Sequence, residues 1–227
     1  MYTALKEIHQ RINDVAVACG RDPEAVKLVA VSKTVPAEHI RPAVEAGVSI
    51  LGENYIQEAG EKLEQLADLN VSWHFIGHLQ SNKAKHAVRW FDLIHTVDSV
   101  KLAKEISKQA AKHDKVQNIL VQVNIGMEDS KSGISEAEAI ALVRDISGFE
   151  HIAIKGLMTI PPYFDAPEQV RPYFKALASL KDKIAAQNIP NVTMDELSMG
   201  MSGDFEAAIC EGATLVRIGT AIFGERR

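Results

Sequence analysis

Apolar and polar positions along the chain follow two alternating patterns. Short runs rich in Val, Ile, Leu and aromatic residues alternate with longer segments in which apolar residues recur at helical spacing. Short apolar runs of this kind are typical of strands that are buried on both faces. We predict eight strands, at residues 27–33, 49–54, 72–77, 92–97, 118–124, 152–160, 193–199 and 214–223.

Helical spacing predicts a helix before the first strand and helices in most of the connecting segments. The connecting helices are predicted at residues 37–46, 56–69, 99–113, 135–146, 167–186 and 203–210. Strands that alternate with helices are parallel and are joined by crossovers. Eight such units in 227 residues favour an α/β fold, a single (β/α)8 TIM-type barrel with an extra N-terminal helix, as one domain over residues 1–227.

An open doubly wound sheet is the alternative fold. The glycine-rich motifs that usually accompany nucleotide-binding open sheets are missing, since neither G-x-G-x-x-G after the first strand nor G-x-x-x-x-G-K-[ST] occurs. The closed barrel is therefore the preferred prediction.

Composition narrows the classes of partner and the cellular location. The formal net charge of −5 predicts no basic surface for nucleic acid or anionic membrane, and no apolar run approaches the roughly 20 residues of a membrane span. The N-terminus lacks the apolar segment of a signal peptide. Cys19 and Cys210 are far apart and form no C-x-x-C pair, which argues against a disulfide framework and suits two unpaired thiols in the cytoplasm. No exposed apolar helix face stands out, so we expect a monomer.

Lys33 ends the first predicted strand, at the edge where barrels carry their active sites. By alternation it shares the inner face with Val29 and Val31. A partly desolvated ammonium group has a lowered pKa and gives the neutral amine that Schiff-base chemistry needs. The alternative is a lysine that extends to solvent over the rim of the barrel.

Two further clusters lie where barrels commonly bind phosphate, after the seventh and eighth strands. The first is "SMGMSGD", residues 198–204, in which glycines allow close approach to a ligand and Ser202 offers a hydroxyl before a helix. A tight turn with Asp204 as a helix cap is the plain structural alternative. The second is "RIGT", residues 217–220, whose Arg217 donates hydrogen bonds only and requires an acceptor, either a carboxylate or a ring nitrogen.

Two other features carry less weight. His74 and His78 are four residues apart on a predicted strand with no third ligand, so we expect no metal site. "SKSG", residues 130–133, could bind an anion but is equally explained as a polar turn.

Seven motifs together resemble the pyridoxal 5′-phosphate (PLP) homeostasis proteins, which are alanine-racemase-like barrels of fold type III. The motifs run in order from about residue 28 to residue 224, as "AVSKT", "GENYIQE", "HFIGHLQSNK", "SKSG", "GLMTI", "LSMGMSGDFEAAI" and "VRIGTAIFG". The resemblance implies that Lys33 forms the internal aldimine with PLP and that Arg217 faces the pyridine nitrogen. It implies a phosphate site at Ser202, Gly219 and Thr220, and a ring pocket lined by Asn54, His78, Met158, Ser198 and Met199. Val35 departs from the pattern, because many relatives carry a second lysine there.

The same resemblance bears on activity. An arginine at the ring nitrogen keeps that nitrogen unprotonated and weakens the ring as an electron sink. A racemase also needs an acid or base on each face of the substrate carbon, and we expect no additional β domain to supply the second, since the chain ends directly after the last predicted strand. Tyr55 and His78 are the nearest substitutes. The predicted function is therefore cytoplasmic PLP buffering and delivery to apoenzymes, with no catalytic residues. A weak amino-acid racemase and a Schiff-base aldolase using Lys33 are the alternatives.

Overall fold

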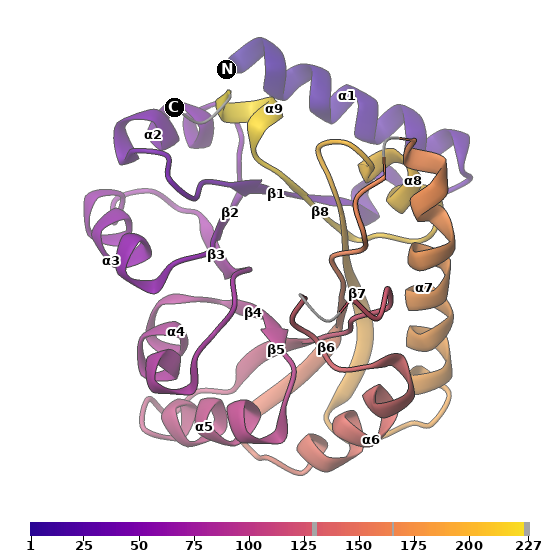
Figure 1. Ribbon diagram of the computed structural model, residues 1–227. Coiled ribbons are helices and arrows are strands. Elements are labelled where there is room, and N and C mark those ends of the chain that lie inside the picture. The colour runs from indigo at the N-terminus through magenta and orange to yellow at the C-terminus, as the bar shows by residue number, and fades with distance from the viewer. Residues whose placement is uncertain (129–130, 165, 225–227) are drawn as a thin grey trace.

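Eight parallel strands form a closed barrel in the computed structural model, which describes residues 1–128, 131–164 and 166–224 (Figure 1). Each strand pairs with the next along the chain, and β8 pairs with β1 to close the barrel. The barrel predicted from the sequence is confirmed. The strands are β1 Lys27–Val31, β2 Ile50–Glu53, β3 Ser72–Phe75, β4 Leu93–Val97, β5 Gln117–Gln122, β6 Ile152–Met158, β7 Val192–Met201 and β8 Leu215–Ile218.

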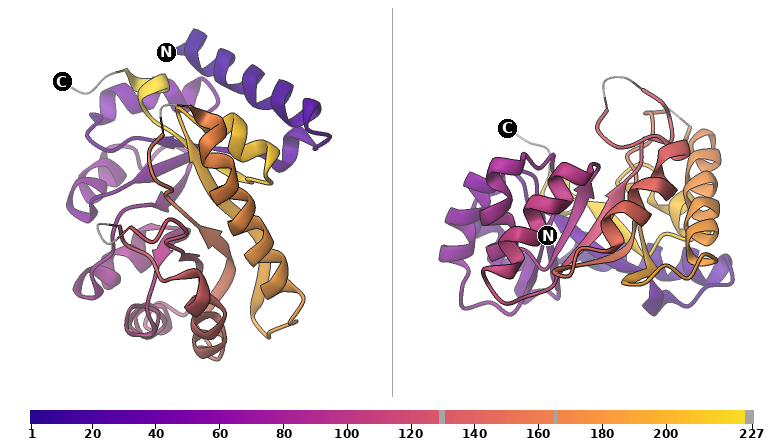
Figure 2. Two further views of the ribbon diagram at one scale, coloured as in Figure 1. Left: turned by 45° about the vertical axis from the view of Figure 1, so that its right-hand side comes forward. Right: turned by 90° about the horizontal axis from the view of Figure 1, so that it is seen from below.

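Helices surround the strands as an outer ring (Figures 1 and 2). The α-helices are α1 Tyr2–Ala18, α2 Ala37–Glu45, α3 Ile56–Gln65, α4 Ala84–Trp90, α5 Val100–Ala111, α6 Glu136–Ser147, α7 Arg171–Ala185, α8 Phe205–Cys210 and α9 Thr220–Phe223. Short 3-10 turns lie at Pro23–Ala25, Ser81–Lys83 and Pro167–Val170.

Two segments differ from the predicted elements. The structure adds α4, a helix that the sequence analysis did not predict between the third and fourth strands. The last predicted strand, 214–223, is wrong beyond Ile218, because Thr220–Phe223 forms the short helix α9 with backbone bonds back to Gly219. A short apolar run does not distinguish a strand from a buried helical turn by periodicity alone.

Strand alternation divides the apolar residues between two cores. Val29, Leu93, Leu120, Met158 and Leu215 fill the barrel interior. The second, larger core lies between the strands and the helices and takes the intervening residues, such as Leu28 and Ala30 of β1. The predicted alternation of β1 is therefore confirmed over Lys27–Val31. The predicted strand 27–33 is wrong beyond Val31, because Lys33 lies in a turn that the hydrogen bond from Val35 N–H to the Ser32 carbonyl oxygen closes.

An irregularity in β7 shapes the mouth of the barrel. Ser198 lies opposite Leu215 of β8, but Met201 lies opposite Arg217, so β7 advances three residues against two. Within this bulge Gly200 has φ +91°, and a Cβ there would lie 2.6 Å from the Cβ of Ala208 in α8. Glycine is required here because only it combines the positive φ with the close approach of α8.

Helix α1 packs against α8 and α9 outside the barrel (Figures 1 and 2). This packing brings Cys19, directly after α1, beside Cys210 at the end of α8, and the two form a disulfide with a Cα–Cα distance of 5.4 Å. The expectation of two unpaired thiols is therefore wrong. The sequence separation of 191 left no spacing signal, since only tertiary packing brings the two cysteines together.

Across the described ranges, none of the helices combines the length and the apolar character needed to cross a bilayer.

Candidate functional site

A cavity of about 270 Å³ opens at the carboxyl ends of the strands. Six of the residues predicted to bind the cofactor line it, namely Lys33, Asn54, Ser202, Arg217, Gly219 and Thr220. They come from the ends of β1, β2, β7 and β8, so the closure of the barrel brings together residues nearly 190 positions apart in the sequence. Val31, Ile76, Ile160 and Met201 add apolar side chains to the wall.

Lys33 and Asn54 lie at the adjacent ends of β1 and β2. Lys33 is half-buried and follows Ser32 directly in the turn after β1. Asn54 follows the last residue of β2, and among the described residues its Oδ1 atom is buried without a hydrogen-bond partner. An amine and a buried acceptor therefore line the same wall of the cavity, and the acceptor is available to a bound molecule.

Hydroxyl groups and glycines line the part of the cavity at the ends of β7 and β8, next to β1. Thr220 Oγ1 lies 3.3 Å from Ser202 Oγ, which joins the loop after β7 to the end of β8. The carboxylate of Asp204 accepts a hydrogen bond from the backbone N–H of Met201 at 2.6 Å and makes no helix-capping bond. Asp204 thus shapes the loop that carries Ser202, instead of capping α8 as the plain structural alternative supposed.

Arg217 is a buried cation held by neutral acceptors. Its guanidinium donates to Ser198 Oγ at 2.5 Å and to the carbonyl oxygen of Thr159 at 2.9 Å. Burial lowers the pKa of Arg217 to about 10, while the charge of Asp204 opposes that shift. The group remains charged at neutral pH, and its remaining donors make it suitable for an acceptor in the cavity that it lines.

Behind Arg217, two histidines extend a hydrogen-bond chain through the barrel interior. Ser198 Oγ lies 2.9 Å from His95 Nδ1, and His95 Nε2 lies 3.0 Å from His74 Nδ1. Burial lowers the pKa of His74 to about 4 and lowers the pKa of His95 well below its ordinary value, so both rings are neutral at pH 7. The sequence analysis missed His95 and considered His74 only as a metal ligand.

The remaining predicted site residues lie outside the cavity wall. Met158 is buried in the barrel interior, and Met199 packs in the core between strands and helices. Ser198 and Met199 are adjacent on β7 and therefore point to opposite sides of the sheet. His78 is exposed, and its Nδ1 atom lies 3.3 Å from Ser132 Oγ. Ser130 of the "SKSG" motif lies outside the described residues.

His74 and His78, the pair considered above as metal ligands, have different partners: His74 bonds to His95, and His78 lies near Ser132. In the part of the chain that the structure describes, no group of three or more His, Cys, Asp or Glu side chains is arranged to hold a metal ion.

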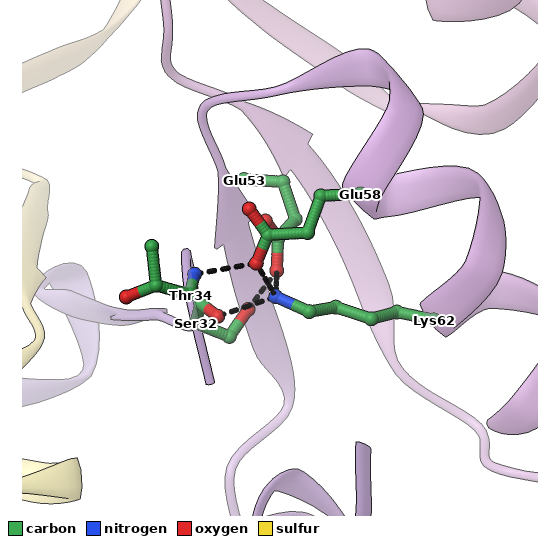
Figure 3. Close-up of polar contacts among 5 residues, drawn as sticks. All are labelled: Ser32, Thr34, Glu53, Glu58 and Lys62. Atoms are coloured by element: carbon green, nitrogen blue, oxygen red, sulfur yellow. Dashed lines mark hydrogen bonds and ion pairs between the residues drawn. The ribbon is translucent and has the colours of Figure 1, made fainter. Parts of the chain in front are cut away.

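A buried ionic cluster contacts the residues on either side of Lys33, and the sequence analysis missed it. It comprises Ser32, Glu53, Glu58 and Lys62 (Figure 3). Lys62 follows Ile56 and Ala59 at intervals of three residues, and all three belong to the buried face of α3. A lysine at an apolar position of a helical face was the signal that could have identified the cluster.

The comparisons with known proteins agree on one family. The family model described as alanine racemase, N-terminal domain, matches residues 4–227. A curated relative from Aquifex aeolicus, named pyridoxal phosphate homeostasis protein, is 46% identical over 223 residues, which are 98% of this chain and 97% of the relative.

Two solved structures are similar to this chain over nearly its whole length. An unknown protein from Bifidobacterium adolescentis superposes with a TM-score of 0.91 at 36% identity, covering 98% of this chain and 94% of the other. PipY from Synechococcus elongatus, solved with PLP bound, superposes with a TM-score of 0.82 at 36% identity, covering 94% of this chain and 100% of PipY.

Proposed function

The chain belongs to the alanine racemase N-terminal domain family and, within it, to the pyridoxal phosphate homeostasis proteins, and we propose that it binds PLP through Lys33. Its role is in PLP homeostasis: it holds the cofactor and delivers it to apoenzymes, without turning over a substrate of its own. The observation that carries this proposal is the convergence of Lys33, Arg217, Ser202 and Thr220 on one cavity.

The residues of the cavity fit the chemical groups of PLP. An amine suits the aldehyde, the hydroxyls of Ser202 and Thr220 suit the phosphate, and Arg217 suits the unprotonated ring nitrogen. Gly219 allows the end of β8 to lie close to the end of β1, because a Cβ there would lie 3.1 Å from the carbonyl oxygen of Val31. The relative PipY, which was solved with PLP bound, supports the same ligand here.

PLP supplies an aldehyde and an electron-accepting ring. Lys33 would hold PLP through its amine, which can add to the aldehyde carbon with loss of water to leave a C=N bond. Addition of water reverses the same step and restores both the amine and the aldehyde, so the cofactor can be released unchanged. Reversible attachment of this kind is what a carrier requires.

The hydrogen-bond donors of Arg217 favour a role in PLP storage over a catalytic role. A guanidinium that already donates to Ser198 and Thr159 presents only further donors to the cavity. A donor at the ring nitrogen holds that nitrogen unprotonated, which weakens the ring's ability to stabilise a carbanion. Decarboxylation and transamination are disfavoured for this reason.

The visible absorption of the purified protein with added PLP tests the proposal. We expect a Schiff-base band at about 420 nm, and borohydride reduction should fix a pyridoxyl group on Lys33. Lys33→Ala should abolish both signals, whereas Lys27→Ala, at the other end of β1, should retain them. A wild-type protein that stays colourless in excess PLP contradicts the proposal. The alternative to test in that case is a Schiff-base aldolase that uses Lys33.

Two assays separate a carrier from a weak racemase. The PLP-loaded protein should restore activity to a PLP-dependent apoenzyme. It should not exchange the α-hydrogen of alanine or serine with solvent deuterium at catalytic rates. Rapid exchange would overturn the non-catalytic assignment.

A further inference from the structure

The turn that carries Lys33 has an unusual backbone. The N–H of Val35 donates to the carbonyl oxygen of Ser32 at 3.0 Å, which closes a four-residue turn with Lys33 and Thr34 at its centre. Thr34 has φ +62°, at a position where such turns favour glycine. A β-branched residue in this conformation is disfavoured unless surrounding contacts hold it.

The buried cluster supplies those contacts on both sides of Lys33 (Figure 3). On the N-terminal side, Lys62 Nζ donates to the carbonyl oxygen of Ser32 at 2.6 Å, and Ser32 Oγ donates to Glu53 Oε1 at 2.6 Å. On the C-terminal side, the backbone N–H of Thr34 donates to Glu58 Oε1.

Lys62 joins the two sides. Its ammonium group donates to Ser32, to Glu53 at 2.8 Å and to Glu58 at 2.5 Å, which uses all three of its N–H groups. The carboxylate of Glu58 therefore links Lys62 to Thr34, and the carbonyl of Ser32 accepts from both Lys62 and Val35. One ammonium thus fixes the backbone before and after Lys33.

Burial makes this arrangement costly as a simple structural brace. The Lys62 side chain is 7% exposed and that of Glu53 is fully buried. Burying an ion pair carries a large desolvation cost, and apolar residues of similar size often stabilise a fold equally well. Burial also raises the pKa of the Glu53 carboxyl, opposed by the nearby charge of Lys62. The contacts with the turn give the cluster a role that apolar packing would not supply.

We propose that Lys62 is a positioning residue for Lys33: through Ser32 and Glu58 it holds the turn so that the amine of Lys33 faces the cavity. This inference rests on the proposed function, since it concerns how readily Lys33 reaches an aldehyde. Lys62 also places a positive charge at this turn, in a chain that carries Val35 where many relatives carry a second lysine.

The alternative is that the cluster only braces α3 against β1 and β2. Pyridoxine 5′-phosphate distinguishes the two, because it has the ring and phosphate of PLP but an alcohol in place of the aldehyde. A positioning role affects the bond to Lys33 and leaves recognition of the ring and phosphate unchanged. A general brace affects both ligands alike.

The experiment compares the binding of both ligands to Lys62→Met and to a matched control. PLP binding is followed by the band at about 420 nm, and pyridoxine 5′-phosphate binding by calorimetry. We expect Lys62→Met to weaken PLP binding by about 10-fold or more and pyridoxine 5′-phosphate binding by less than about 3-fold. The control is Lys115→Met, which removes a partly buried ammonium bonded to the carbonyl of Val88, and it should change neither.

Glu58→Met provides a second variant if Lys62→Met does not fold. The Glu58 side chain is 26% exposed, so its replacement disturbs packing less while removing the acceptor for Thr34. It should weaken PLP binding selectively, as Lys62→Met does. Equal weakening of both ligands, or no weakening of either, overturns the positioning role. A wild-type protein that binds pyridoxine 5′-phosphate but develops no band with PLP contradicts the proposed function instead.

Discussion

His95 Nε2 lies 3.0 Å from His74 Nδ1 inside the barrel, and this contact ends a hydrogen-bond chain that starts at Arg217. Arg217 donates to Ser198 Oγ, which lies 2.9 Å from His95 Nδ1. At the contact between the two rings one nitrogen must donate and the other must accept, so the contact is lost if both histidines are protonated. The chain therefore depends on the buried histidines remaining neutral.

The first prediction concerns pH. The pKa of His74 is lowered to about 4, and that of His95 is also lowered, in both cases mainly by burial. Below about pH 6.5 the unfolded chain takes up protons that the folded chain excludes. The contribution of the two histidines to the free energy of unfolding is therefore fully present above that pH. It decreases as the pH falls, by about 1.4 kcal/mol per pH unit for each histidine. Urea unfolding at pH 7, 6 and 5 measures this slope.

His74→Gln serves as the comparison for the pH dependence. Glutamine does not titrate, so the slope between pH 6 and pH 5 should decrease by about 1.4 kcal/mol per unit. The raised pKa of Glu53 acts in the opposite direction and is common to both proteins. An unchanged slope would contradict the assignment of neutral histidines.

The second prediction separates the two serines near Arg217. Ser198→Ala removes an acceptor from a buried cation and a partner from His95, so the free energy of unfolding of the PLP-free protein should decrease by about 1–3 kcal/mol. Ser202→Ala should leave that stability nearly unchanged and weaken PLP binding, because its hydroxyl lines the cavity. In urea unfolding Ser198→Ala should show the larger loss of stability, and in PLP titration Ser202→Ala should show weaker binding. The same loss of stability in both variants would contradict the roles assigned here.

The third prediction tests whether Asn54 contributes to the PLP site. A Cβ on Gly77 would lie 2.1 Å from the carbonyl oxygen of Asn54, so Gly77→Ala must displace the end of β2. We expect a loss of about 1–3 kcal/mol in stability together with weaker PLP binding. Gly148→Ala is the control, because a Cβ there meets no atom within 4 Å. Wild-type PLP affinity in Gly77→Ala would show that Asn54 does not contribute to the site.

The fourth prediction concerns the disulfide between Cys19 and Cys210. It links positions 191 residues apart, so its reduction should lower the free energy of unfolding by about 2–4 kcal/mol. The buried residues of α1, Leu5, Ile8, Ile12 and Ala16, should keep that helix folded after reduction. Urea unfolding with and without reductant tests the loss, and Cys19→Ser should be insensitive to reductant. Equal stability with and without reductant in the wild-type protein would exclude a stabilising disulfide.

The local sequence determined which residues at the strand ends face inward. Side chains on a strand alternate with a period of two, so Val31 shares the inner face of Val29 and Arg217 shares that of Leu215 without reference to the rest of the chain. Lys33 lies beyond the end of β1, and the turn after the strand, not the alternation, sets its direction. The same rule, applied strictly, would have separated Ser198 from Met199, which the family resemblance placed in one pocket.

Contacts between residues that are distant in the sequence depend on tertiary packing. The β7 bulge at Gly200, the pairing of Cys19 with Cys210 and the bonds from Lys62 to Ser32 all depend on how one element packs against another. Periodicity reports the face on which a residue lies, but it carries no information about the partner across that face. For that reason the sequence predicted the barrel and six of the residues that line its cavity, whereas the cluster around the turn of Lys33 depends on the packing of β1, β2 and α3 (Figure 3).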